Sequence, residues 1–239
     1  MLISSIRFNS IMLGIFALVT SSILASTHLG TKERIAEAQR KVAQKALLEI
    51  VPKERHDNDL LMDTLTIPDH FLATLGIDSG DIKVARKDNQ LVAMIVPATA
   101  PDGYNGDIKM IIGINLDDNT IAGVRIVEHR ETPGLGDKVD TNKSKWVTGF
   151  NGKSLANPTI DKWKVKKDGG EFDQFTGATI TPRAVVQQIA KVLQYFQEDK
   201  QRLIKEAMSK NTLPDTDLPK PGEIISSQPD AETKEPDNG

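Results

Sequence analysis

The sequence contains no cysteine and little histidine. Because none of its 239 residues is cysteine, disulfide bonds, iron–sulfur ligation and thiol chemistry are excluded. The four histidines are scattered, and no two have the i,i+4 spacing of a metal-binding helix, so we expect no histidine-based metal site. Any redox chemistry would therefore depend on a borrowed cofactor.

Strong charge of either sign is also missing. The formal net charge is −3 at pH 7, which is too small to indicate nucleic acid or another highly charged partner. Hydrophobic residues make up 38% of the chain. That share is enough for a core, and the length predicts one domain with additional segments.

The N-terminal region lacks charged residues over a long run. No Asp, Glu, Lys or Arg occurs from Phe8 to Thr31, and residues 11–25 are almost all apolar. Because about 20 apolar residues cross a bilayer as a helix, we predict a transmembrane anchor at residues 10–30. A short N-terminal segment, residues 1–9, precedes it.

Two questions about this segment have more than one answer: whether it is cleaved, and on which side of the membrane the body lies. A cleaved signal peptide would be cut best after Ala25, but Ile23 then stands where a small residue is preferred, so we favour a retained anchor. Only Arg7 and the amino terminus precede the span, whereas five basic residues follow it closely (Lys32, Arg34, Arg40, Lys41 and Lys45). The positive-inside rule alone would therefore put the body in the cytoplasm.

The body of the chain shows the patterns of an α+β domain. Residues 31–52 are predicted to form a stalk helix that Pro52 ends. Two pairs of strand-like runs with short turns then predict a mainly antiparallel sheet of at least four strands (residues 81–86, 91–98, 107–115 and 120–129). A long amphipathic helix is predicted from Pro182 to about Lys210. We expect a single domain at residues 53–211, with helices flanking the sheet and one transmembrane helix before it.

The last stretch, residues 212–239, differs in composition from the rest. It holds five of the twelve prolines, no aromatic residue and a net charge of −5. Such a segment cannot bury enough apolar area to order itself, so we predict a disordered acidic tail.

The loop EHRETPGLGDKV, at residues 128–139, is the first candidate site. It leaves the end of a predicted strand, where a rigid sheet often positions functional loops. Pro133 and Gly134 suit the central positions of a type II turn, and Gly136 lets a ligand approach the backbone. Leu135 could offer an apolar surface to a flat ring, although an ordinary turn with Leu135 in the core explains the pattern equally well.

The segment DQFTGATITPRAVV, at residues 173–186, is the second candidate. Thr181 is predicted as the N-cap of the long helix and Pro182 as its first residue, which leaves Thr176 and Thr179 unexplained. The free N–H groups and dipole of a helix start favour a phosphate, so the segment predicts a phosphate-bearing group near Thr179. A threonine hydroxyl without a base is a poor nucleophile, so another enzyme would have to attach that group.

The segment DQFTGAT resembles the flavinylation motif of FMN-binding domains in bacterial respiratory complexes, an Asp followed by Ser/Thr-Gly-Ala-Thr. The anchor, a GY-x-G turn at residues 103–106 and the ETPGLG loop at residues 131–136 are also similar to that family, up to about Lys200. Within it, the chain most resembles the G-type subunits of Rnf (Rsx) complexes, rather than the longer, related C-type subunits of sodium-pumping quinone reductases. Thr176, where Ser is usual, and the acidic tail are the departures.

The resemblance implies a covalent flavoprotein. In the family, a flavin transferase uses FAD to esterify FMN, through its phosphate, onto the residue that matches Thr179. The resemblance also implies the other cofactor-binding residues, which are Thr176, Gly177, Ala178 and Thr181 near the phosphate, and Tyr104, Glu131, Thr132, Gly134, Leu135 and Gly136 around the ring. No metal site and no catalytic residue are expected.

The resemblance further implies an electron relay between other subunits of a bacterial ion-translocating electron transport complex, with no diffusible substrate of its own. It implies a single-pass protein of the inner membrane whose body lies in the periplasm, against the charge count. The alternative is a membrane-anchored, extracytoplasmic, non-redox ligand-binding or sensor domain, in which the TGAT segment only caps a helix.

Overall fold

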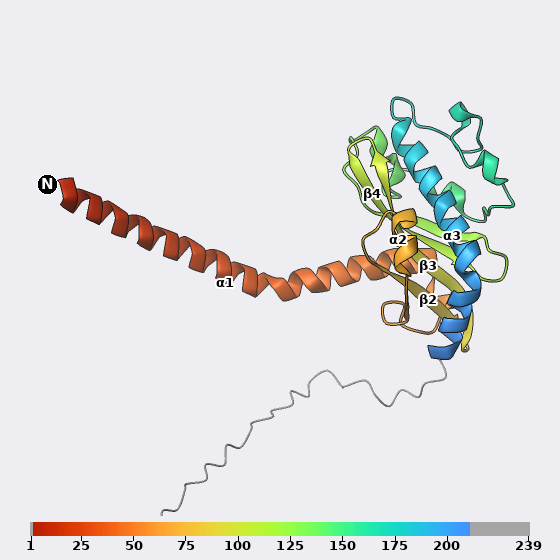
Figure 1. Ribbon diagram of the computed structural model, residues 1–239, viewed down its shortest axis with the longest axis horizontal. Coiled ribbons are helices and arrows are strands. Elements are labelled where there is room, and N and C mark those ends of the chain that lie inside the picture. Colours follow the sequence, from red (N-terminus) through yellow and green to blue (C-terminus); the bar gives the residue numbers. More distant parts are fainter. Residues whose placement is uncertain (1, 211–239) are drawn as a thin grey trace, which may run out of the picture.

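The computed structural model describes residues 2–210 of the chain (Figure 1). It has a long N-terminal helix, a five-stranded antiparallel sheet and a long C-terminal helix, which confirms the predicted α+β class. The predicted tail at residues 212–239 lies outside the described residues.

Helix α1 (Leu2–Ile50) is a single continuous helix that covers both the predicted anchor and the predicted stalk. Its segment Asn9–Lys32 is long and apolar enough to cross a membrane, and none of its most apolar stretch is buried in the protein. Figure 1 shows α1 projecting away from the body as a long, bent helix that meets the sheet only at its C-terminal end. The helix stops just before Pro52, as the sequence predicts.

The sheet is a simple meander in which each strand pairs antiparallel with the next along the chain. The predicted hairpins correspond to β2–β3 and β4–β5. The strands are β1 (Thr64–Thr66), β2 (Asp81–Lys87), β3 (Gln90–Gly103), β4 (Gly106–Asn115) and β5 (Ile121–Glu128). Sequence patterns missed β1, because three residues are too few to show an alternation of apolar and polar side chains.

Helices and helical turns fill the connections. Helix α2 (Asp69–Leu75) lies between β1 and β2, and the predicted long C-terminal helix is α3 (Ile180–Lys210). Short 3-10 turns occur elsewhere, at Lys53–Arg55, Gly136–Val139, Trp146–Phe150, Ile160–Lys162 and Lys166–Asp168. The long segment between β5 and α3 therefore holds no strand of the sheet, only turns and loops.

Helix α3 covers one face of the sheet (Figure 1). The face predicted to be apolar is fully buried (Val185, Ile189, Val192, Leu193 and Phe196). These side chains share a core with Met94, Val96 and Ala98, which alternate along β3. Near the other end of α3, the buried Arg86 donates to the carbonyl oxygen of Ala207 over 2.7 Å, which fastens the helix to β2.

The C-terminal end of α1 packs on the opposite face of the sheet. Leu47, Ile50 and Val51 form a second buried cluster with side chains of β2 and β3. Gly113 and Gly123 are paired across β4 and β5, and both lie against Ile50. A Cβ atom on Gly113 would lie 2.2 Å from Ile50 Cγ2. The two glycines thus form a notch in which the end of the stalk is seated.

We predict that Gly113→Ala lowers the stability of the body. The added methyl group meets a branch atom close to the backbone of Ile50, so the stalk must shift, and overpacking of this kind costs about 1–3 kcal/mol. Chemical denaturation of the detergent-solubilised chain measures the change. Gly149→Ala is the matched control, because a Cβ there meets nothing within 4 Å. Equal stability of the two variants would contradict the notch.

Candidate functional site

The two candidate segments, which are far apart in sequence, lie against each other in the structure. A Cβ atom on Gly177 would lie 3.4 Å from Cδ2 of Leu135, so the ETPGLG loop touches the TGAT segment at its glycine. Gly177 also has φ +83°, a left-handed conformation that side chains disfavour. The backbone conformation therefore favours glycine at this position, whereas a Cβ atom would make only an ordinary contact with Leu135.

Each segment makes the same kind of glycine turn. The N–H of Leu135 donates to the carbonyl oxygen of Thr132 over 3.1 Å, with Gly134 at φ +80°. This agrees with the type II turn predicted for Pro133 and Gly134. In the second segment, the N–H of Ala178 donates to the carbonyl oxygen of Phe175 over 3.1 Å, with Gly177 in the corresponding position.

The start of α3 differs from the prediction. The helix begins at Ile180, and the N–H of Arg183 donates to the carbonyl oxygen of Thr179 over 3.2 Å. Thr179, rather than Thr181, therefore precedes the first helical residue, and the prediction of Thr181 as N-cap with the next proline as first helical residue is wrong. Thr181 is fully buried, and its hydroxyl donates to Oε2 of Glu131 over 2.5 Å. That long-range partner cannot be seen in local spacing.

Glu131 connects three parts of the site. Its side chain is only 5% exposed. Besides accepting from Thr181, it accepts the N–H of Asn105 through Oε1 over 3.1 Å. The amide of Asn105 also donates to the hydroxyl of Thr132 over 3.1 Å. The predicted GY-x-G turn forms the tip of the β3–β4 hairpin, and these bonds join it to the ETPGLG loop and to α3.

Thr179 is suited to carry a phosphate. It is half-buried, and within residues 2–210 its hydroxyl takes part in no hydrogen bond. The backbone N–H groups of Ile180 and Thr181 likewise have no acceptor among the described residues. These free N–H groups and the positive end of the α3 dipole favour an anion beside Thr179. The residues present therefore fit the FMN phosphate.

Exposed apolar side chains belong to the elements around Thr179. Tyr104 at the hairpin tip is 65% exposed, Leu135 is 42% exposed and Ile180 is 44% exposed. Ile180 was not among the predicted site residues; the sequence placed it just before the predicted helix start and gave it no role. Exposed apolar side chains on the elements that surround Thr179 suit a flat, partly apolar ligand.

Sequence patterns also missed Trp146, which contacts the residues that precede the TGAT tetrapeptide. Its indole N–H donates to the carbonyl oxygen of Asp173 over 2.8 Å, and its ring contacts Phe175 edge-on with centroids 5.0 Å apart. Both partners lie directly before the TGAT tetrapeptide. A tryptophan 27 residues away gives no local signal of this role.

Two ion pairs flank the acceptor segment. Lys166 lies 2.7 Å from Asp173, and Arg183 holds Asp168 through two bonds of 2.6 and 2.9 Å. Hydrogen bonding by Arg183 lowers the pKa of the Asp168 carboxyl below its ordinary value. Asp173 raises the pKa of Lys166 through its hydrogen bond and its charge. Lys166 and Arg183 therefore remain positively charged at neutral pH beside the TGAT segment.

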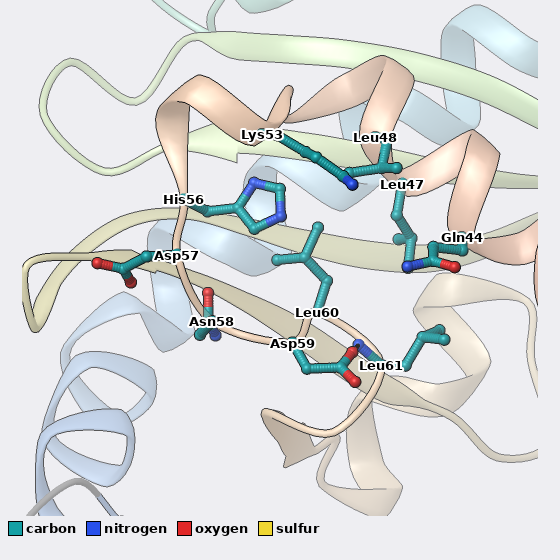
Figure 2. A pocket seen from close by; sticks show the side chains of 10 residues that line it. All are labelled: Gln44, Leu47, Leu48, Lys53, His56, Asp57, Asn58, Asp59, Leu60 and Leu61. Atoms are coloured by element: carbon teal, nitrogen blue, oxygen red, sulfur yellow. Dashed lines mark hydrogen bonds between the residues drawn. The ribbon is translucent and has the colours of Figure 1, made fainter.

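A cavity of about 430 Å³ lies elsewhere, beside the C-terminal end of α1 (Figure 2). Figure 2 shows leucines from the helix end and from the following loop around it, together with Lys53 and His56. The side chains of Asp57, Asn58 and Asp59 are already hydrogen-bonded within the fold; Asp57, for example, accepts the N–H of Asp88 over 2.7 Å. None of its lining residues belongs to the ETPGLG or TGAT segments.

Comparison with known proteins shows the family to which this chain belongs. The FMN-binding domain family matches residues 103–194, and the RnfG N-terminal region matches residues 1–50. The G subunit of the ion-translocating oxidoreductase complex of Vibrio cholerae serotype O1 (strain M66-2) is 43% identical over 202 residues, covering 84% of this chain and 95% of that protein. The chain belongs to the RnfG family, the G subunits of ion-translocating oxidoreductase complexes.

Further members of the RnfG family are similarly close. The Pseudomonas aeruginosa PAO1 protein is 47% identical over 197 residues, which cover 82% of this chain and 91% of that protein. Among solved structures, the crystal structure of Shewanella oneidensis NqrC is 27% identical with a TM-score of 0.43, covering 62% of this chain and 75% of that one. The region matched by the FMN-binding domain family includes the hairpin tip, the ETPGLG loop and the TGAT segment.

We predict that Thr181→Val destabilises the chain by about 1–3 kcal/mol, because it leaves a buried carboxylate oxygen without its donor. Valine keeps the shape of threonine, so packing is little changed. Thr176→Val is the control; Thr176 is exposed, and a change there is expected to stay within about 0.5 kcal/mol. Denaturant unfolding of the two proteins compares them, and an unchanged Thr181→Val midpoint would contradict the role of this bond.

Proposed function

We propose that this chain carries FMN, esterified through its phosphate to Thr179, and relays electrons between other subunits of a membrane-bound ion-translocating oxidoreductase complex. The observation that carries the proposal is the Thr179 hydroxyl. It lies in an Asp-x-x-Thr-Gly-Ala-Thr motif, has no hydrogen-bond partner among the described residues and stands next to the free N–H groups of a helix start.

A bound flavin would supply the redox chemistry that the amino acids cannot. The chain has no cysteine, so its own residues cannot ligate an iron–sulfur cluster. Flavin accepts and donates one or two electrons, which suits a carrier placed between different redox centres. The task of this chain is then to hold the flavin, to shield part of it and to present it to partner subunits.

Attachment requires a flavin transferase with FAD as the co-substrate. The Thr179 hydroxyl oxygen forms a bond to the phosphorus of the FMN half of FAD, the pyrophosphate bond breaks, AMP leaves and the hydroxyl proton passes to solvent. The chain contributes the acceptor and its setting. The transferase contributes the base, because the site shows no histidine or carboxylate bonded to Thr179 among the described residues.

The surrounding residues would divide into two groups. Thr176, Gly177 and Ala178 form the turn before Thr179 and would line the phosphate, with the N–H of Thr181 on its other side. Tyr104, Thr132, Gly134, Leu135 and Gly136 come from the hairpin tip and the facing loop and would border the ring. Exposure of Tyr104 and Leu135 supports their part in this arrangement.

We predict that Thr179→Val abolishes covalent flavin while leaving the fold intact, because it removes only the half-buried hydroxyl. Thr176→Ser, which keeps a hydroxyl of the type usual in the motif, should retain full flavin content. In-gel fluorescence after denaturation and mass spectrometry of tryptic peptides, after co-expression with a flavin transferase, measure both. Covalent flavin on the Thr179→Val protein, or a flavin peptide that maps to Thr176 or Thr181, would sink the assignment.

We also propose how the chain is divided and oriented. Residues 10–30 act as a single-pass anchor in the bacterial inner membrane, residues 31–52 as the stalk and residues 53–211 as the FMN-binding domain, which lies in the periplasm. The basic residues after the span oppose this orientation. The short N-terminus, with one arginine, is a weak topogenic signal, so the family resemblance decides.

We predict that alkaline phosphatase fused after Gly239 is active and that green fluorescent protein fused at the same place is dark. Phosphatase folds only outside the cytoplasm, where its disulfides form, whereas the fluorescent protein reports a cytoplasmic location. Comparable amounts of both fusions in membranes, measured by immunoblot, provide the control. Fluorescence without phosphatase activity would place the body in the cytoplasm, in agreement with the charge count.

A further inference from the structure

We propose that Glu131 is a positioning residue for flavin attachment: its buried carboxylate holds the start of α3 and the β3–β4 hairpin tip together, so that Thr179 is presented to the transferase. The inference rests on the proposed attachment of FMN to Thr179. It differs from the role implied by resemblance alone, which placed Glu131 at the border of the ring.

The first support is the setting of the carboxylate. A carboxylate that is 5% exposed is costly unless it is well hydrogen-bonded. Among the described residues Glu131 has no ion-pair partner; it receives one neutral donor on each oxygen, the N–H of Asn105 and the hydroxyl of Thr181. Loss of either donor would leave a buried carboxylate oxygen without a hydrogen bond, which is unfavourable. The hairpin tip and the start of α3 are therefore held at fixed positions by the carboxylate.

The second support is the space left for the carboxylate. A Cβ atom on Gly136 would lie 2.5 Å from Glu131 Oε2 and 2.8 Å from the Thr181 hydroxyl oxygen. A Cβ atom on Gly103 would lie 2.9 Å from Glu131 Oε1. Two glycines, one in the hairpin and one in the ETPGLG loop, therefore pack directly against the carboxylate. At Gly136 no larger side chain fits unless the carboxylate moves, whereas at Gly103 a Cβ atom would also lie 2.2 Å from the carbonyl oxygen of Gly106.

The third support is the short path from Glu131 to the acceptor. Thr181 is the second residue of α3, and Thr179 lies two positions before it, immediately outside the helix. The first helical turn is closed by the bond from the Arg183 N–H to the Thr179 carbonyl oxygen. Holding the Thr181 side chain therefore limits movement of the acceptor backbone, while the Thr179 hydroxyl stays free for reaction.

The consequence concerns the rate of attachment. In the transfer step the Thr179 oxygen must align with the phosphorus of FAD opposite the departing AMP, and a displacement of about 1 Å can cost up to about a hundredfold in rate. A loosened helix start would reach that alignment less often. We therefore expect Glu131→Ala to slow attachment roughly tenfold or more. Glu131→Gln should remain within about threefold of the parent, because the Gln side chain can still pair with both donors after the Thr181 hydroxyl rotates.

The experiment follows covalent flavin over time in the purified, detergent-solubilised full chain, incubated with flavin transferase and FAD. Denaturing-gel fluorescence and intact mass are the readouts, and the melting temperature of each variant is measured in parallel. Asp199→Asn is the matched control, because Asp199 is a similarly buried carboxylate that pairs with Tyr195 and Arg202 on α3, away from the acceptor. It should lower the melting temperature without slowing attachment.

Each outcome decides the proposal. Attachment to Glu131→Ala at the parent rate would overturn it, and so would a Gln variant as slow as Ala or an equally slow Asp199→Asn protein of the same stability. If Glu131→Ala does not fold, Thr181→Val tests the same bond from the other side, with Thr181→Ser as its conservative partner. If the parent chain itself takes up no flavin, the proposed function is contradicted. If the parent takes up flavin but Glu131→Ala does so at the same rate, only the Glu131 proposal is contradicted.

Discussion

The packing of α3 across one face of the sheet is the interaction on which the candidate site depends. The helix buries a continuous apolar face on β3 and is held in its N-terminal third by the amide of Gln188, which donates to the carbonyl oxygen of Thr74 over 3.1 Å. This packing places the first residues of α3 at one end of the sheet. The β3–β4 hairpin tip and the loop after β5 leave the sheet at that same end, so hydrophobic burial brings the site's three segments together.

Much of the fold follows from local patterns. The antiparallel hairpins, the long helix and the single apolar span each have a strong periodic signal or a turn signal, and all of them are found in the structure. The glycine turn at Pro133 and Gly134 was also predictable, because its conformation depends on residues next to one another. These features share a short sequence separation between the groups that determine them.

The remaining features depend on contacts between distant residues. Thr181 has the sequence appearance of a helix cap, yet its hydroxyl is drawn to Glu131, 50 residues earlier. Trp146 and the glycine notch under Ile50 likewise have meaning only once the sheet and helices are assembled. A buried carboxylate inside a glycine-rich loop resembles any polar turn residue in sequence. Its burial is decided by the neighbours that tertiary folding supplies.

The candidate site combines a rigid frame with an accessible acceptor. Glu131, Thr181 and Gly136 are buried, whereas Thr179 is half-buried and the apolar side chains of Leu135, Ile180 and Tyr104 reach the surface. The side chains that hold the TGAT segment are therefore buried, whereas Thr179 itself stays partly accessible. The proposed attachment of FMN to Thr179 would need that accessibility.

Because α1 is continuous, the length of the stalk sets the position of the body relative to the anchor. From Lys32 to Ile50 an unbroken helix rises about 27 Å, and its end is seated in the Gly113–Gly123 notch and bonded to Arg125 by Glu49. The distance of the body from the bilayer and its rotation about the α1 axis are then coupled. Each added residue lifts the body by about 1.5 Å and rotates it by about 100°. A change in stalk length that is not a whole number of turns would therefore rotate the Thr179 side of the body relative to the membrane-spanning part of α1.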